Sequence, residues 1–221
     1  ASSQLVFLDN PRLTFVHFVN KIRHHSSLST FSSDTNNSIQ IGKNCRIGSL
    51  AIIGENCVIG DNVAIEDRAS LKNCQIGDGC LIQSGVAIGS DGFAYERHPN
   101  GELERFPHLG RVVIEKNVEI CANTSITRGS LGDTTIGDGT KMDALVHVAH
   151  NVKIGNNCQL AAGTIIGGST VVGNSCWTGL NSTLKNQIRV GNAVLVAAGA
   201  CVINDLPDGE IVAGVPAKSI K

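Results

Sequence analysis

The hydrophobic positions of this chain recur at intervals of six residues. Branched apolar side chains begin the register at Ile41 and keep it over most of the chain, with a five-residue step from Leu71 to Ile76 and a ten-residue step from Ile126 to Ile136. A glycine or a small polar residue usually follows each of these positions, where a sharp corner needs permissive backbone. The pattern therefore predicts one short strand and one corner for each hexapeptide.

Small or branched side chains stand four residues after each apolar position, and Cys57, Cys80 and Cys158 are among them. Three hexapeptides would close a triangular coil, and the coils would stack at a strand spacing of ~4.8 Å. This pattern resembles the left-handed β-helix acyltransferase superfamily over residues 39–215. The resemblance implies an all-β fold, a left-handed parallel β-helix of hexapeptide repeats with a short N-terminal strand and helix.

Two segments interrupt the repeat. Residues 89–111 contain Pro99, Pro107 and three of the eight aromatic residues, so they cannot continue the coil and must form an extruded loop. The stretch RGSLGDTT fills the ten-residue step and is expected to bring Arg128 and Asp133 to the surface. Long loops on rigid scaffolds commonly carry binding residues.

The first part of the chain does not follow the repeat. LVFLDNPRLTFVHFVNKI predicts a short strand and then a helix that is capped by Asn10 and opened by Pro11. One face of this helix is expected to carry its apolar residues, namely Phe15, Phe18, Val19 and Ile22. We expect residues 1–37 to be the remnant of another small domain with its linker, residues 38–215 to form the β-helix, and residues 216–221 to form a C-terminal tail.

Composition narrows the classes of function. Only 4% of the residues are aromatic and 25 are glycine, which favours a regular stack of small side chains, and a formal charge of −1 gives no general attraction to nucleic acid. The eight cysteines show no CxxC pairs and no secretory signal precedes them, so we expect free thiols in a reducing compartment. No apolar run approaches the roughly 20 residues that cross a bilayer, and no transmembrane segment is expected.

One histidine stands where the repeat turns outward. His150 lies two residues after Val148, so it should point away from the prism, and Gly168 takes the equivalent place one coil later. An imidazole beside a bare backbone N–H suits acyl transfer, because the imidazole takes a proton from an attacking amine while the N–H stabilises the oxyanion of a thioester carbonyl. In a trimer of prisms, His150 would face the neighbouring chain.

Three segments carry a narrower resemblance. GSDGFAY, LGRVVIEKNVEICANTSITRGSLGDTTIGDGTKMD and HVAHNVKIG resemble the UDP-3-O-acylglucosamine N-acyltransferases of lipid A biosynthesis, and FLDNPRLTFVHFVNKI is similar to the end of their uridine-binding domain. The resemblance implies a homotrimer that moves a 3-hydroxyacyl chain from the phosphopantetheine of acyl carrier protein to the 2-amine of UDP-3-O-acylglucosamine, without a metal or other cofactor. His150 carries over as the general base and Gly168 as the oxyanion donor.

Further residues match or depart from that family. The expected substrate-binding residues are Asn151, His147, Asp143 and Gln187. Gln187 stands where the family often has a second histidine, Thr127 replaces an aspartate, and the front of the uridine-binding domain is missing. These losses, the Ser-rich linker and the cysteines resemble plant copies of the enzyme, which implies a mitochondrial location, with the bacterial cytoplasm as the alternative.

Three other functions remain open at this point. A γ-class carbonic anhydrase shares the prism and binds Zn²⁺ through three histidines, but only His147 and His150 are close in this sequence. The O-acyltransferase that acts on UDP-N-acetylglucosamine has a similar HxAH run. A non-catalytic trimeric scaffold is compatible with Gln187 and the shortened front.

Overall fold

The computed structural model describes residues 9–27 and 39–220, with side chains for residues 9–22 and 39–220. Contacts divide the chain into two compact units, one formed by the N-terminal residues with 93–108 and one formed by residues 37–92 with 109–221. The predicted N-terminal strand and most of the Ser-rich linker lie outside the described residues, and the first linker residues, up to Ser27, instead continue the helix.

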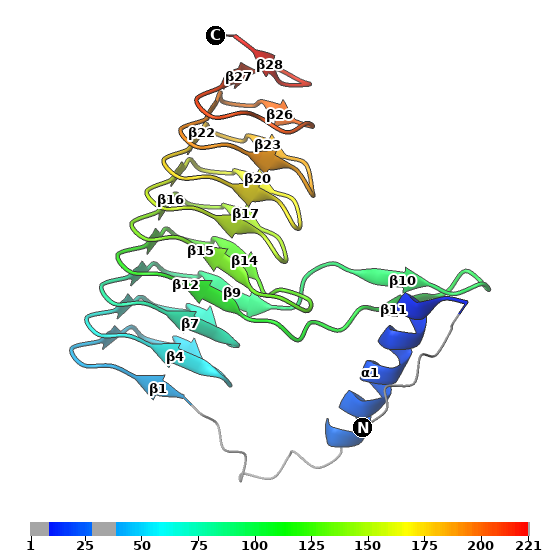
Figure 1. Cartoon of the computed structure of the whole chain (residues 1–221). Helices are drawn as coiled ribbons and strands as arrows, with labels where there is room; N and C mark the ends of the chain where they lie inside the picture. The colour runs from blue at the N-terminus through cyan, green and yellow to red at the C-terminus, as the bar shows by residue number, and fades with distance from the viewer. Residues whose placement is uncertain (1–8, 28–38, 221) are drawn as a thin grey trace, which may run out of the picture. The chain divides into compact units, whose positions relative to one another are not determined.

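The larger unit is a parallel β-helix with three sheets (Figure 1). Sheet A contains β1 (Gln40–Ile41), β4 (Cys57–Ile59), β7 (Cys74–Ile76), β12 (Val112–Ile114), β15 (Thr134–Ile136), β18 (Lys153–Ile154), β21 (Val171–Val172) and β24 (Arg189–Val190). Sheet B contains β2 (Arg46–Ile47), β5 (Ala64–Ile65), β8 (Leu81–Ile82), β13 (Glu119–Ile120), β16 (Lys141–Met142), β19 (Gln159–Leu160), β22 (Trp177–Thr178), β25 (Leu195–Val196), β27 (Ile211–Ala213) and β28 (Lys218–Ser219). Sheet C contains β3 (Ile52–Ile53), β6 (Ser70–Leu71), β9 (Ala87–Ser90), β14 (Ser125–Thr127), β17 (His147–Val148), β20 (Ile165–Ile166), β23 (Thr183–Leu184) and β26 (Cys201–Val202).

Inside the stack each strand pairs in parallel with the strands one coil before and one coil after it, whereas the last strand, β28, pairs antiparallel with β27. In sheet C, for example, His147 lies in register with Ser125 on one side and Ile165 on the other. The five-residue step is absorbed by a short corner between Leu71 and Cys74, where Asn73 has a φ of 46°. The predicted parallel β-helix of hexapeptide repeats is confirmed.

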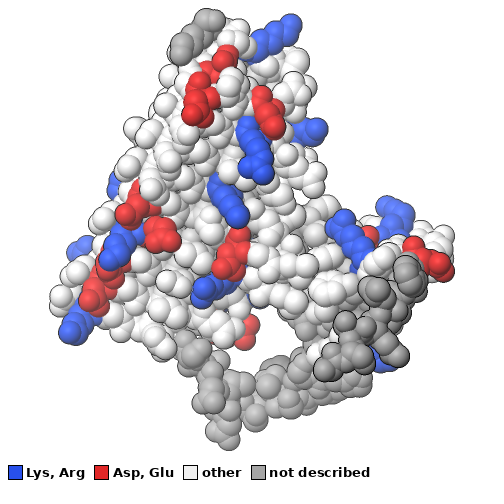
Figure 2. All heavy atoms as spheres, viewed as in Figure 1, with Lys and Arg blue, Asp and Glu red and all other residues white. Residues whose placement is uncertain are grey.

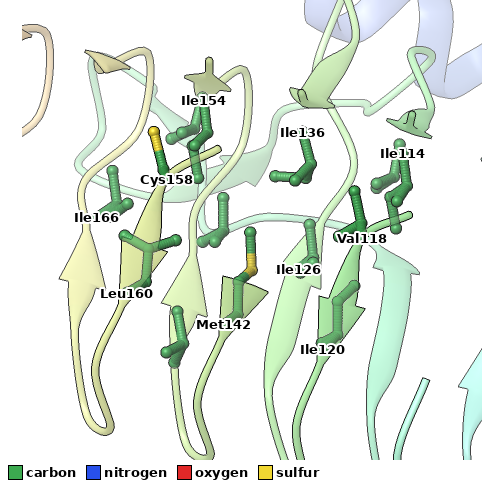
Figure 3. Packing of buried hydrophobic residues seen from close by; sticks show 14 of the residues in the cluster. Ile114, Val118, Ile120, Ile126, Ile136, Met142, Ile154, Cys158, Leu160 and Ile166 are labelled. Carbon is green, nitrogen blue, oxygen red and sulfur yellow. The ribbon is translucent and has the colours of Figure 1, made fainter. Parts of the chain in front are cut away.

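The apolar positions of the repeat form the core. Figure 3 shows Ile114, Ile136 and Ile154 from successive coils pointing into the interior, and all three are buried. Ile41 and Ile47 keep exposed fractions of 44% and 47%, because the first described coil stacks against a neighbouring coil on one side only. The six-residue pattern therefore marks the inward positions correctly along the whole stack.

The corners after sheet A are tied together by side chains. Backbone N–H groups donate to an Oδ1 atom one coil further on, from Asp138 to Asn156 (2.9 Å), from Asn156 to Asn174 (2.8 Å) and from Asn174 to Asn192 (2.9 Å). We call these four residues the Asn/Asp ladder. It satisfies one backbone donor of each turn without using water.

The smaller unit contains α1 (Pro11–Ser27) and a hairpin of β10 (Tyr95–Arg97) and β11 (Leu103–Arg105). The predicted cap is confirmed, since the Leu13 N–H donates to Asn10 Oδ1 over 3.0 Å. The predicted apolar face is partly wrong, because Phe18 is 62% exposed whereas Val16 is buried. Phe15 does contact Phe106, with 6.0 Å between the ring centroids, so the covered side of the helix includes Phe15 and Val16 but not Phe18.

All eight cysteines are free thiols, and five of them are buried. Burial raises the pKa of the Cys80 thiol to about 11, so this group stays protonated at neutral pH. Within the described parts of the chain, no helix is both long and apolar enough to cross a membrane.

Candidate active site

His150 lies at the corner that follows β17, two residues after the buried Val148. The His150 carbonyl accepts a hydrogen bond of 2.9 Å from the Ser169 N–H, which sets this corner against the corner of the next coil. A Cβ atom added to Gly168 would lie 2.9 Å from both Cε1 and Nε2 of His150. Only glycine leaves room for the ring, and the predicted placement of His150 beside Gly168 is confirmed.

Asn151 determines which imidazole nitrogen carries the proton. Its Oδ1 atom lies 3.0 Å from Nδ1 of His150 and also accepts hydrogen bonds from the N–H and Oγ–H of Ser130, at 3.0 and 2.8 Å. An amide oxygen cannot donate, so Nδ1 of His150 must be the donor. Nε2 is then the basic nitrogen, on the side of the ring that reaches Gly168.

The turn at residues 128–133 holds the Asn151 amide in this orientation. Asn151 Nδ2 donates to the Gly132 carbonyl over 3.0 Å, and the Asn151 N–H donates to Thr134 Oγ1 over 2.9 Å. Sequence reasoning missed Ser130 and Thr134, although the RGSLGDTT insertion was a signal for them. The prediction for Arg128 was wrong, because its side chain is only 12% exposed and donates from Nε to the Gly110 carbonyl over 2.6 Å.

The Gly168 N–H differs from its counterparts in the Asn/Asp ladder. Gly168 occupies the same turn position as Asn156, and Asn186 follows it one coil later as Asn174 follows Asn156. Among the described residues, however, no group accepts a hydrogen bond from the Gly168 N–H, and Asn186 does not close this rung. A backbone donor beside the imidazole is thus available to a ligand.

His147 points outward from sheet C and is half-buried. Burial lowers its pKa, so the ring is neutral at pH 7. Its neighbours along the outer face of the sheet are uncharged, namely Ile52, Ser70, Ala87, Ser125, Ile165, Thr183 and Cys201. His147 therefore belongs to an uncharged face next to the corner of His150.

The remaining two predicted residues lie in different places. The Gln187 N–H donates to the Gly168 carbonyl over 2.9 Å, so Gln187 adjoins the site through its backbone, with an exposed side chain. Asp143 follows β16 at the corner after sheet B, where its Oδ1 accepts the Ala144 N–H over 2.7 Å. Within one chain the structure brings His150, Asn151, Gly168 and Gln187 together and places Asp143 at another corner.

A shallow hollow of about 420 Å³ adjoins the turn that holds Asn151. Its lining includes Leu131, Arg111 and Asp133, and the last two form an ion pair of 3.3 Å. Figure 2 shows positive and negative side chains interspersed on the visible face, without a continuous basic surface. Over the described ranges, no three His, Cys, Asp or Glu side chains are grouped so that they could hold a metal ion.

The fold and this corner define a hexapeptide-repeat β-helix protein with a histidine packed on a glycine. Residues 38–73 and 133–168 match the bacterial transferase hexapeptide family, whose model covers six repeats. Among solved structures, a UDP-N-acetylglucosamine acyltransferase from Campylobacter jejuni has a TM-score of 0.75 at 24% identity and covers 83% of this chain and 70% of its own. The enzyme of that name from Bacteroides fragilis has a TM-score of 0.66 at 27% identity and covers 84% and 70%.

Curated relatives narrow the class. The UDP-3-O-acylglucosamine N-acyltransferase of Rhizobium meliloti is 45% identical over 153 residues, which are 69% of this chain and 43% of that protein. The enzyme of the same name from Caulobacter vibrioides is 47% identical over 146 residues, or 66% and 43%. The chain is a homologue of the UDP-3-O-acylglucosamine N-acyltransferases and spans less than half of their length.

Proposed function

We propose that this protein transfers a 3-hydroxyacyl chain from acyl carrier protein to the 2-amine of UDP-3-O-acylglucosamine. Nε2 of His150 takes a proton from the amine as its nitrogen attacks the thioester carbonyl, and the new C–N bond forms. The Gly168 N–H stabilises the oxyanion of the tetrahedral intermediate. When the C–S bond breaks, the imidazolium returns its proton to the departing sulfur, so the products are an amide and the carrier thiol.

The observation that carries this proposal is the packing of His150 on Gly168. The ring occupies the space in which a Gly168 side chain would lie, and Asn151 directs the basic nitrogen toward that side. A base and an N–H donor at adjoining corners can act on the same reacting carbonyl group. The step uses no protein nucleophile, metal or resident cofactor, since the phosphopantetheine arrives with the carrier.

The proposal includes a homotrimer in which each site is completed by a neighbouring chain. The uncharged outer face of sheet C, with the neutral ring of His147 in it, suits burial against a second copy. Asp143 and Trp177 line a hollow of about 310 Å³ on sheet B, away from the corner of His150 in the same chain. A neighbouring copy would be the means of bringing Asp143 to the substrate. Sedimentation of the purified protein tests the trimer directly.

The acceptor is tested by a transfer assay. Purified protein is mixed with 3-hydroxyacyl carrier protein and either UDP-3-O-acylglucosamine or UDP-N-acetylglucosamine, and the products are measured by mass spectrometry. We expect an alkali-stable amide with the amine acceptor and no product with UDP-N-acetylglucosamine. An ester with the second acceptor would assign the protein to the O-acyltransferases, and no product with either acceptor from an intact trimer would favour the non-catalytic scaffold.

Two further proposals concern the domain to which α1 belongs and the location of the protein in the cell. We propose that α1 belongs to a uridine-binding domain, and that the protein works in mitochondria as plant copies would. The support is the similarity of the segment around α1 and of the linker composition to those proteins. Fractionation of cells that express the full natural chain would show a mitochondrial signal, whereas a cytoplasmic signal would contradict this location.

A further inference from the structure

Ser130 contacts the residue that orients the candidate base. Three donors converge on Asn151 Oδ1, and Ser130 supplies two of them, its N–H at 3.0 Å and its hydroxyl at 2.8 Å. The third is Nδ1 of His150 at 3.0 Å. The hydroxyl of Ser130 therefore binds the same oxygen atom as the imidazole.

The position of Ser130 is itself well determined. Its carbonyl accepts the N–H groups of Leu109 at 2.6 Å and Gly110 at 3.1 Å, so the end of the long insertion ties the turn down. A side chain on Gly129 would collide with the Gly132 carbonyl and come within 2.9 Å of Asn151 Nδ2. The turn thus has little freedom to withdraw Ser130 from Asn151.

We propose that Ser130 is a positioning residue that keeps His150 in the tautomer with the proton on Nδ1. If the Asn151 amide turned over, its NH₂ group would face Nδ1, which would then have to accept a hydrogen bond, and the proton would move to Nε2. Nε2 could then no longer act as a base. The two donors of Ser130 oppose this turnover because they would face an NH₂ group instead of an oxygen.

The role of Ser130 in turnover rests on the proposed acyl transfer, but its effect on the tautomer does not. Side-chain ¹⁵N chemical shifts in histidine-labelled protein report which nitrogen is protonated, and His150→Ala assigns the signals. We compare the parent, Ser130→Ala and Ser130→Thr. Ser84→Ala is the control, because the Ser84 hydroxyl also binds a side-chain oxygen one coil away, that of Glu66 at 3.1 Å, at the corner after sheet B.

In Ser130→Ala we expect a measurable fraction of His150 with the proton on Nε2 and a fall of about fivefold in kcat, the size expected for losing one hydrogen bond. Ser130→Thr and Ser84→Ala should match the parent in both. A Ser130→Ala variant that keeps the parental tautomer and melting temperature would overturn the proposal. If the parent shows no acyl transfer, the ¹⁵N shifts still decide the role of Ser130, and only the proposed reaction fails.

Discussion

The corners after sheet A and the corner of His150 are built on the same turn and behave differently. Asn157 after sheet A and Asn151 after sheet C both adopt left-handed backbone, with φ of 53° and 61°. One position earlier, the Asn/Asp ladder closes each backbone N–H with a side chain of the next coil. At the corner of His150 a histidine and a glycine replace ladder residues, and the N–H of the glycine keeps no acceptor among the described residues.

This difference shows how a repetitive scaffold acquires a site. The ladder adds hydrogen bonds that stabilise the stack, and its side chains use the donors that a ligand would need. The ladder does not extend to the corner after sheet C, where the Gly168 N–H keeps no acceptor among the described residues and the imidazole takes the space that a side chain would fill. Residues 89–111 and the turn at residues 128–133 both leave the coil after a strand of sheet C. The groups that orient the base therefore lie at the corner of His150.

The largest expected effect comes from filling the space at Gly168. In Gly168→Ala the new Cβ would lie 2.9 Å from His150 Nε2, so the ring must move, and a displacement of this kind costs about 100-fold in kcat. The control is Gly54→Ala, one turn position earlier at the corner after sheet C of another coil, where the Cβ would come no closer than 3.2 Å to another atom. Equal rates for both variants and the parent would show that His150 does not act at Gly168.

The next largest effect is expected at Asn151, which we compare with Asn157 because both residues have a positive φ. Asn151→Ala and Asn157→Ala carry the same backbone strain, because alanine is poorly suited to positive φ in both turns. Only Asn151 binds the imidazole, so we expect Asn151→Ala to lose about tenfold in kcat and Asn157→Ala to retain the parental rate. Steady-state kinetics at saturating acceptor make the comparison, and a similar loss in both variants would reduce Asn151 to a structural role.

A smaller effect is expected on stability, and here the corners after sheet A should be more sensitive to mutation than those after sheet C. Asn174→Ala removes the oxygen that accepts the Asn156 N–H, and we expect a loss of about 1 kcal/mol in the free energy of unfolding. Asn186→Ala, at the same turn position after sheet C, should stay within about 0.5 kcal/mol of the parent. Urea denaturation at one protein concentration measures both. An equal loss would mean that the ladder does not distinguish the two corners.

The smallest effect is the dependence of stability on pH at His147. Burial lowers the pKa of this ring in the folded chain, so the unfolded chain binds more protons as the pH falls below about 6.5, and folding is penalised there. His147→Gln should show a shallower decline in the free energy of unfolding below that pH. Parallel declines for the parent and the variant would contradict the burial of a neutral ring on sheet C.

The repeat and the pairing of His150 with Gly168 were predictable because both depend on chain spacing alone. A six-residue period specifies the inward positions, and an eighteen-residue separation places two corners next to each other. The buried side of α1 was not predictable, since Val16 and Phe18 are both apolar and the hairpin decides which of them is covered. The contacts of Ser130 and Arg128 were also out of reach, because an insertion follows its own hydrogen bonds and not the period of the coil.

The most direct test of the account compares His150→Ala with Asn156→Ala, since the two residues occupy the same turn position at the two kinds of corner. Each variant is assayed for amide formation from 3-hydroxyacyl carrier protein and UDP-3-O-acylglucosamine, and its melting temperature is measured. The account predicts that His150→Ala loses transfer by at least about 100-fold with a parental melting temperature, whereas Asn156→Ala melts earlier and transfers at the parental rate. Transfer by His150→Ala at the parental rate would contradict it.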